Sequence, residues 1–195
     1  MNKECLIKEL KFFYSEYLYL KKVYHAYWHI NSAMQQQDKA KNFLEVTRST
    51  CIETFHMMLA KFYDEGKDAM SVYSLIEDCK KNCNLFIDSE DTFKYLTDVR
   101  REIKKCDAKN KIRFRRNKWL AHNDAKYFFN ADESAEEDQY LPNYEIWQLI
   151  DRIGNLLKYI LNQLGEKYEE DFSNDVVDIK DLLPDTEFTS SPLKF

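Results

Sequence analysis

The sequence predicts an all-α protein, and two of its features carry this prediction. In 195 residues there are only three glycines and three prolines, whereas β-hairpins and tight strand–helix turns depend on these two residue types. Apolar residues also recur at steps of three, four and seven, which is the spacing of amphipathic helices. A chain of this length suits a single core. We therefore predict one bundle of about five to six helices over residues 1–170, followed by a poorly structured acidic tail over residues 171–195.

The first two predicted helices are long. The first covers residues 3–34, and its apolar stripe consists of Ile7, Leu10, Tyr14, Tyr17, Tyr24 and Trp28. The second runs from about Phe43 to Tyr63 and is closed by Gly66, because glycine commonly follows the end of a helix. Its stripe consists of Phe43, Val46, Ile52, Phe55, Met58, Leu59 and Phe62. His56 falls among these apolar residues and is expected to be a core or interface histidine.

The first helix carries more aromatic side chains than one face of a helix can bury. They are Phe12, Phe13, Tyr14, Tyr17, Tyr19, Tyr24, Tyr27 and Trp28. Two interpretations stand side by side. The rings either pack against other helices or a second subunit, or serve as platforms on which nucleic-acid bases stack.

The remaining helices are predicted from the same period and from capping residues. A short helix fits residues 72–86, and another fits residues 90–106 behind the capping candidates Asp88 and Ser89. A further helix runs from about Asn110 to Asn123, and Pro142 starts a last long helix. The apolar stripe of that last helix consists of Ile146, Leu149, Ile153, Leu156, Leu157, Ile160 and Leu164.

Several classes of protein are excluded by what the sequence lacks. Its glycines are too far apart to form a phosphate-binding glycine loop, which argues against nucleotide chemistry of the Rossmann or P-loop kind. No run of about 18 apolar residues is present, and charges interrupt the apolar residues at the N-terminus. Five cysteines, an odd number, favour reduced thiols. We expect a cytoplasmic protein with no membrane partner.

Metal sites are not predicted. Cys79 and Cys83 could share one helix face, as could His25 and His29, but neither pair has further ligands at a suitable spacing. The sequence also shows no acidic cluster suited to magnesium. No cofactor is expected.

Positive charge is concentrated in one segment of an acidic chain. Between positions 100 and 118 the basic residues are Arg100, Arg101, Lys104, Lys105, Lys109, Lys111, Arg113, Arg115, Arg116 and Lys118. Because the whole chain carries −5 and this segment +8, the other residues carry −13. The segment is either a solvated face that balances acidic neighbours, or a phosphate-binding patch on a protein whose remaining acidic surface repels nucleic acid.

The phrase FRRNKWLAHND, residues 114–124, lies at the end of this segment. On a helical wheel Arg116 falls on the apolar side with Ile112, Trp119 and Leu120. Burial of an arginine there costs free energy unless a negative group pairs with its charge. A carboxylate such as Asp64 or Glu65 could meet it, or Arg116 could belong to a functional site. Arg115 and His122 align within about 20° and can act together; His122 could instead cap the helix end.

The order Arg116-Asn117 and, five positions later, His122 resembles the signature of HEPN domains. The wider phrase RRNKWLAHND is similar to that of the AbiU-like branch of this superfamily, which takes part in abortive infection. The likeness in helix order extends over about residues 25–165. It implies an all-α, HEPN-like helical bundle that dimerises so that two copies of the motif face each other. It further implies RNA or a nucleotide as ligand and an antitoxin protein as a candidate partner.

Many domains of this kind are metal-independent endoribonucleases, and others bind nucleotides or partners without catalysis. In the first case RNA is cut by its own 2′-hydroxyl, which requires a group that moves a proton and a cation near the phosphate. His122 would move the proton and Arg116 would stabilise the charge. Asn117 would orient the phosphate and Asp124 the imidazole. The RNA backbone would be held by Arg115, Lys118, Lys111 and Arg113.

One geometric difficulty accompanies this assignment. On an ideal helix Arg116 and His122 point about 120° apart. They converge only if the helix is irregular, if the long arginine bends round, or if each subunit of a dimer supplies one of the two residues.

Overall fold

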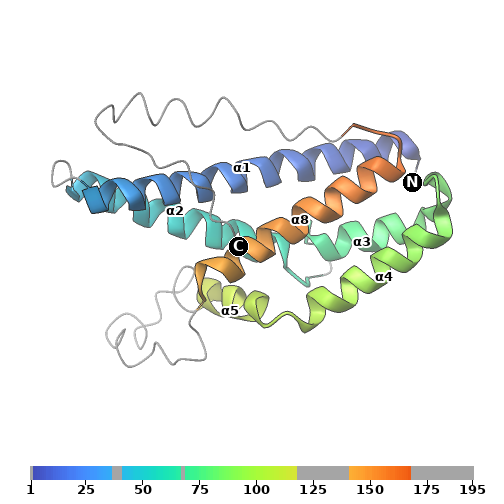
Figure 1. Ribbon diagram of the computed structural model, residues 1–195. Helices are drawn as coiled ribbons and strands as arrows, with labels where there is room; N and C mark the ends of the chain where they lie inside the picture. The colour runs from blue at the N-terminus through green and yellow to red at the C-terminus, as the bar shows by residue number, and fades with distance from the viewer. Residues whose placement is uncertain (1, 37–40, 67–68, 118–140, 168–195) are drawn as a thin grey trace.

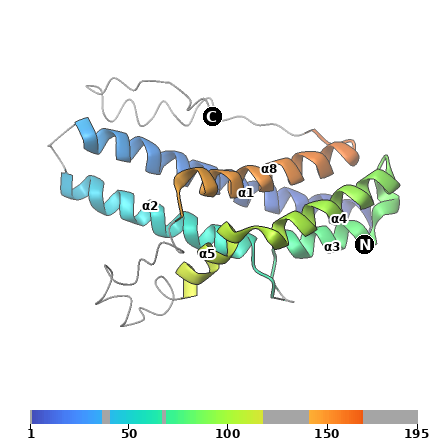
Figure 2. The ribbon, with the colours of Figure 1, turned by 60° about the horizontal axis from the view of Figure 1, so that its bottom comes forward.

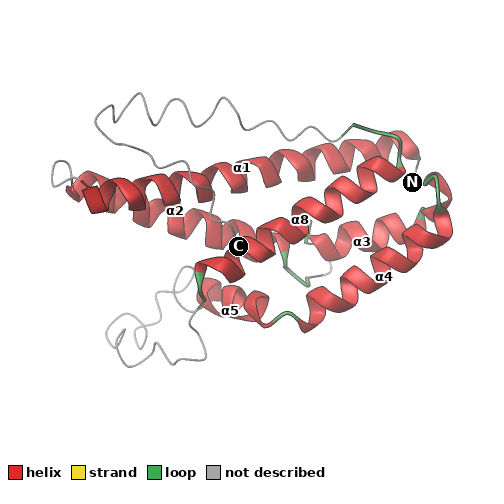
Figure 3. Cartoon of the chain, viewed as in Figure 1, coloured by secondary structure: helices red, strands yellow, loops and turns green. Residues whose placement is uncertain are grey.

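A computed structural model describes residues 2–36, 41–66, 69–117 and 141–167 of the chain. Within these ranges the protein is helical and contains no strand, so the all-α prediction is confirmed (Figure 3). The helices are α1 (Lys3–Gln36), α2 (Lys41–Phe62), α3 (Val72–Lys81), the 3₁₀ turn η1 (Cys83–Leu85), α4 (Ser89–Lys105), α5 (Asp107–Arg115) and α8 (Asn143–Gln163). No described helix combines the length and apolar character needed to cross a membrane. The predicted tail lies outside the described residues.

The two longest helices, α1 and α2, lie side by side as a hairpin (Figures 1 and 2). An aromatic cluster joins them. The Tyr24 ring meets the Phe55 ring edge-on at 5.4 Å, and the Tyr27 ring lies 5.6 Å from Phe55. Packing accounts for Phe13, Tyr17, Tyr24 and Tyr27, which are buried. Phe12 and Tyr19 are about half exposed, and base stacking stays a prediction.

Helix α8 lies between the α1–α2 hairpin and the α3–α4 pair (Figure 1). The predicted stripe of this helix is buried along its whole length. Its position is fixed by hydrogen bonds as well: the Tyr63 hydroxyl donates to the Leu149 carbonyl at 2.6 Å, and the Tyr24 hydroxyl to the Asn143 carbonyl at 3.0 Å. The end of α2 is thereby tied to the N-terminal third of α8.

The predicted stripe of α2 is wrong at its N-terminal end. Phe43 and Val46 are 69% and 66% exposed. This part of α2 meets the far end of α1 through Leu44, which packs with Ile30 and Ala33 in a small separate cluster. The opposite side of the helix has no cover among the described residues, whereas Phe55, Met58, Leu59 and Phe62 enter the main core.

Helix boundaries agree with the sequence prediction to within a few residues. Asp88 caps α4 as expected, because its carboxylate accepts a hydrogen bond from the Asp91 amide at 2.9 Å. The predicted helix over residues 72–86 divides at Asn82 into α3 and η1. Helix α5 begins three residues earlier than expected, and Pro142 stands just before α8 in an extended conformation.

Candidate functional site

Helix α5 packs against α2 and brings Arg116 to the end of that helix. Nη1 of Arg116 lies 2.9 Å from Oδ2 of Asp64, which follows α2. The other oxygen of Asp64 accepts a hydrogen bond from the Gly66 amide at 2.8 Å. The Gly66 amide and, after it, the Arg116 guanidinium hold the pKa of Asp64 below its usual value. Asp64 is thus the carboxylate partner that an arginine on the apolar side of the helix requires.

Arg116 stays within reach of solvent although Ile112, one turn earlier, is fully buried. The side chain of Arg116 is 26% exposed, and its Nε donates to Oδ1 of Asn117 at 3.0 Å. The first two residues of the predicted catalytic set are therefore in direct contact. Asp64 holds the same guanidinium through Nη1.

Arg115 has a different partner, the buried His56 of α2. Nη1 of Arg115 lies 3.1 Å from Nε2 of His56, and Nδ1 of His56 lies 2.7 Å from the Ile52 carbonyl. Since a carbonyl only accepts, Nδ1 carries the hydrogen and Nε2 accepts from the guanidinium. Burial, together with the nearby Arg115 charge, lowers the pKa of His56 to about 4, against the Ile52 hydrogen bond that raises it. Burial also lowers the pKa of Arg115.

The neutral state of His56 should make the protein less stable in mild acid. Below pH 6.5 an unfolded His56 binds a proton, whereas the folded one does so only near pH 4. The free energy of unfolding should therefore fall as the pH drops through this window, by about 2 kcal/mol between pH 7 and 5. Urea unfolding at both pH values tests this, with His56→Gln as the control because glutamine does not titrate. An equal loss in the control would assign the effect to other groups.

Much of the positive charge of the basic segment is balanced within the fold. Arg100 pairs with Glu77 at 3.1 Å and Arg101 with Asp98 at 2.8 Å. The other pairs are Lys109 with Glu65, Lys111 with Asp107 at 3.4 Å and with Glu145 at 3.9 Å, and Arg116 with Asp64. The interpretation of a face that balances acidic neighbours thus describes a large part of this segment. Lys104, Lys105 and Arg113 are exposed.

The chain departs from α-helical geometry at the motif. Helix α5 ends at Arg115, and Arg116 and Asn117 have π-helical geometry. Short π-helical turns recur at functional sites. An irregular helix was the first of the three conditions under which Arg116 and His122 converge. His122, Asp124 and Lys118, as well as Trp119 and Leu120, lie outside the described residues.

No group of three or more metal-binding side chains occurs in the described part of the chain. The His25 ring packs edge-on against Trp147 at 6.0 Å, which fits a packing role for this histidine. Cys79 is buried and burial raises the pKa of its thiol.

Comparison with known proteins identifies a family. The model of a protein family described as AbiU2, of the HEPN type, matches residues 3–182. No curated protein and no solved structure matches the chain.

Proposed function

Because the chain belongs to the AbiU2 family of HEPN proteins, we propose that it is a metal-independent endoribonuclease that cuts single-stranded RNA at a dimeric site. The 2′-hydroxyl oxygen of the RNA would bond to phosphorus while the bond from phosphorus to the 5′-oxygen breaks. One group must accept the 2′ proton and another must protonate the leaving oxygen. Two copies of His122, one from each subunit, would supply both, and the product would carry a cyclic phosphate.

The observation that supports this proposal best is the position of Arg116. Asp64 and Asn117 fix its guanidinium through Nη1 and Nε. Among the described contacts this leaves Nη2 to donate to a phosphate oxygen, as a charge-assisted hydrogen bond. A guanidinium held in place before the substrate arrives stabilises developing charge without reorganisation.

The experiment is a cleavage assay on fluorescent single-stranded RNA, with EDTA and with magnesium. We expect cleavage at the same sites and similar rates under both conditions. Salt-sensitive RNA binding without cleavage in either condition would contradict the nuclease proposal. It would favour the second candidate function, a non-catalytic module that binds a nucleotide or RNA. Five cations of the basic segment are ion-paired, so the positive charge that remains suits a single nucleotide, with its few phosphates, better than a long RNA backbone.

The dimer is a separate prediction. The motif offers one histidine per chain, so acid and base together need two chains. Ile112 needs no second subunit for its burial, because it is already fully buried within one chain. Light scattering should give twice the chain mass of 23.5 kDa. A mass near 23.5 kDa across micromolar concentrations would contradict the dimeric site.

Binding of the RNA backbone is assigned to the basic residues beside the motif. Arg113 is exposed, and we expect Arg113→Ala and Lys118→Ala to weaken RNA binding and each to reduce the slope of log affinity against log salt by about one. Arg115→Ala should also weaken binding, and in addition lower stability because Nε2 of the buried His56 loses its donor. Fluorescence anisotropy at several salt concentrations measures the slopes. Unchanged slopes in Arg113→Ala and Lys118→Ala would contradict the assignment.

The setting proposed for this activity is defence, by abortive infection or as a toxin of a toxin–antitoxin pair. A ribonuclease active against cellular RNA needs restraint in the resting cell, and an antitoxin protein is the partner that would provide it.

A further inference from the structure

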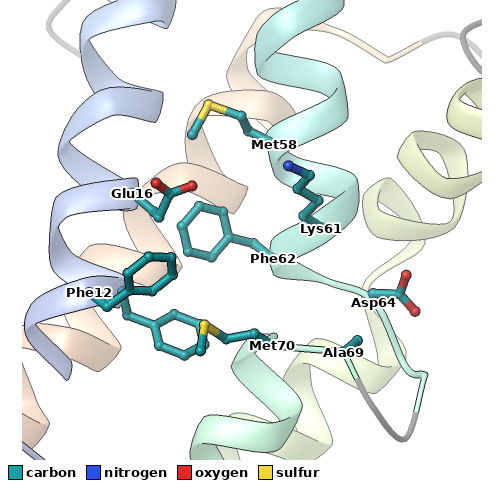
Figure 4. Close-up of a pocket in the computed structure, with 9 residues that line it drawn as sticks. Phe12, Glu16, Met58, Lys61, Phe62, Asp64, Ala69 and Met70 are labelled. Atoms are coloured by element: carbon teal, nitrogen blue, oxygen red, sulfur yellow. The ribbon is translucent and has the colours of Figure 1, made fainter. Parts of the chain in front are cut away.

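A hollow of about 310 Å³ opens between α1, the end of α2 and the chain that leads into α3 (Figure 4). Its floor consists of the buried side chains Phe13, Met58 and Phe62. Sites that enclose small molecules measure about 300–1,000 Å³ and are mostly apolar with a few polar groups. The hollow lies at the lower end of this range, which suits one flat ring system.

Two large apolar side chains at the rim of this hollow are exposed. Phe12 of α1 is 50% exposed, and Met70, before α3, is 54% exposed. They come from separate parts of the chain and line the same concavity. A phenyl ring and a thioether on one concave surface are suited to contact the face of an aromatic ligand. Phe12 is thus the aromatic residue of α1 whose position suits base stacking.

Polar groups of opposite charge flank the apolar surface. Glu16 comes from α1 and Lys61 from α2, and Figure 4 shows them on opposite sides of the hollow. A carboxylate only accepts hydrogen bonds, and an ammonium group only donates them. The Watson–Crick edge of guanine carries the N1–H and N2–H₂ donors, and its Hoogsteen edge, on another side of the base, carries the O6 and N7 acceptors. A carboxylate on one side of the base and an ammonium group on another can therefore bind guanine together. Adenine presents a bare N1 acceptor where guanine has a donor.

The hollow adjoins the proposed catalytic site. Asp64 lines it and also holds the Arg116 guanidinium at 2.9 Å. Asp64 therefore borders both the hollow and the site of Arg116. Unstacked bases of single-stranded RNA are recognised in this manner, by stacking on side chains and by hydrogen bonds to their edges.

We propose that this hollow binds a guanine base of the single-stranded RNA substrate, an inference that rests on the proposed ribonuclease function. Phe12 and Met70 contact the face of the base, the Glu16 carboxylate accepts from N1–H and N2–H₂, and the Lys61 ammonium group donates to O6.

The first test uses nucleosides, because they carry no phosphate and report on the hollow alone. Dissociation constants from NMR titration should increase in the order guanosine, inosine, adenosine, since inosine lacks the N2 amino group and adenosine also lacks N1–H. Glu16→Gln should remove on the order of tenfold of the guanosine preference, the effect of losing a charged hydrogen-bond partner. Phe12→Ala should weaken all three nucleosides by roughly fivefold or more.

Tyr19→Ala is the matched control, because Tyr19 is an aromatic residue of the same helix, 54% exposed, that does not line the hollow. This variant should bind the nucleosides as the wild type does. Circular dichroism checks that each variant is folded. Equal affinities for guanosine and adenosine, or the same loss in Tyr19→Ala as in Phe12→Ala, would overturn the proposal.

The second test separates this proposal from the nuclease proposal. Oligouridine with 2′-O-methyl groups at every position cannot be cut, and a version with one guanosine should bind on the order of tenfold more tightly. Glu16→Gln should abolish this difference. If the preference is present while unmodified RNA is never cut, the guanine site stands and the nuclease proposal fails. If unmodified RNA is cut without metal but no guanine preference is found, the nuclease proposal stands and the guanine site fails.

Discussion

Protein carrying His122→Ala is expected to lose RNA cleavage by roughly 10²–10⁴-fold, because the group that moves the proton is gone. Arg116→Ala should cost a similar factor through the loss of the cation at the phosphate. Arg116→Ala should leave the fold intact, because water can then solvate the Asp64 carboxylate. The Asp64 side chain is 35% exposed, and it still accepts a hydrogen bond from the Gly66 amide. Rates come from single-turnover cleavage, and circular dichroism reports the fold.

Arg101→Ala serves as the control for these variants. Arg101 belongs to the same basic segment but pairs with Asp98 on the exposed side of α4, so its loss should leave cleavage within about twofold of the wild type. A comparable loss of activity in Arg101→Ala would show that net charge matters more than position. Unfolding of His122→Ala would make the histidine structural and the motif one of packing.

Phe55→Ala should have the largest effect on stability among single substitutions in α2. Phe55 is 1% exposed and lies at the centre of the aromatic cluster with Tyr24 and Tyr27. Truncation of a buried phenylalanine costs about 3–5 kcal/mol of the free energy of unfolding. At this chain length the melting temperature should fall by roughly 6–20 °C. Urea and thermal unfolding measure both quantities.

Phe43→Ala is the matched control, since it makes the same substitution in the same helix at a side chain that is 69% exposed. Its cost should stay within about 0.5 kcal/mol. A cost as large as that of Phe55→Ala would mean that Phe43 is covered in solution by another chain.

The helices could be predicted from the sequence because they depend on local pattern. The stripe of α8 and the Asp88 cap of α4 follow from spacing and residue type alone, and both are confirmed. Phe43 and Val46 fit the same period, but whether a periodic apolar residue is buried depends on which helix faces it. No helix among the described residues covers this part of α2 on that side.

The candidate site could be predicted only in part. Sequence reasoning gave Asp64 or Glu65 as carboxylates that could pair with Arg116, because an arginine on an apolar stripe needs a counter-charge. The partner is Asp64, whereas Glu65 pairs with Lys109.

Sequence reasoning missed the contact between Arg115 and His56, which are 59 positions apart in the chain. His56 was expected to be a core or interface residue, and its burial to 3% exposure agrees with the first of these. Its role as acceptor for an arginine beside the motif depends on how α5 crosses α2, which no local spacing encodes.

The most direct test of the ribonuclease account is the chemistry of the ends that the wild-type protein leaves on single-stranded RNA in EDTA. Attack by the 2′-hydroxyl predicts a 2′,3′-cyclic phosphate on one fragment and a free 5′-hydroxyl on the other, both identifiable by mass spectrometry. The same RNA with 2′-deoxy sugars should remain intact. Fragments with 5′-phosphates, or cleavage of the 2′-deoxy strand, would contradict the account.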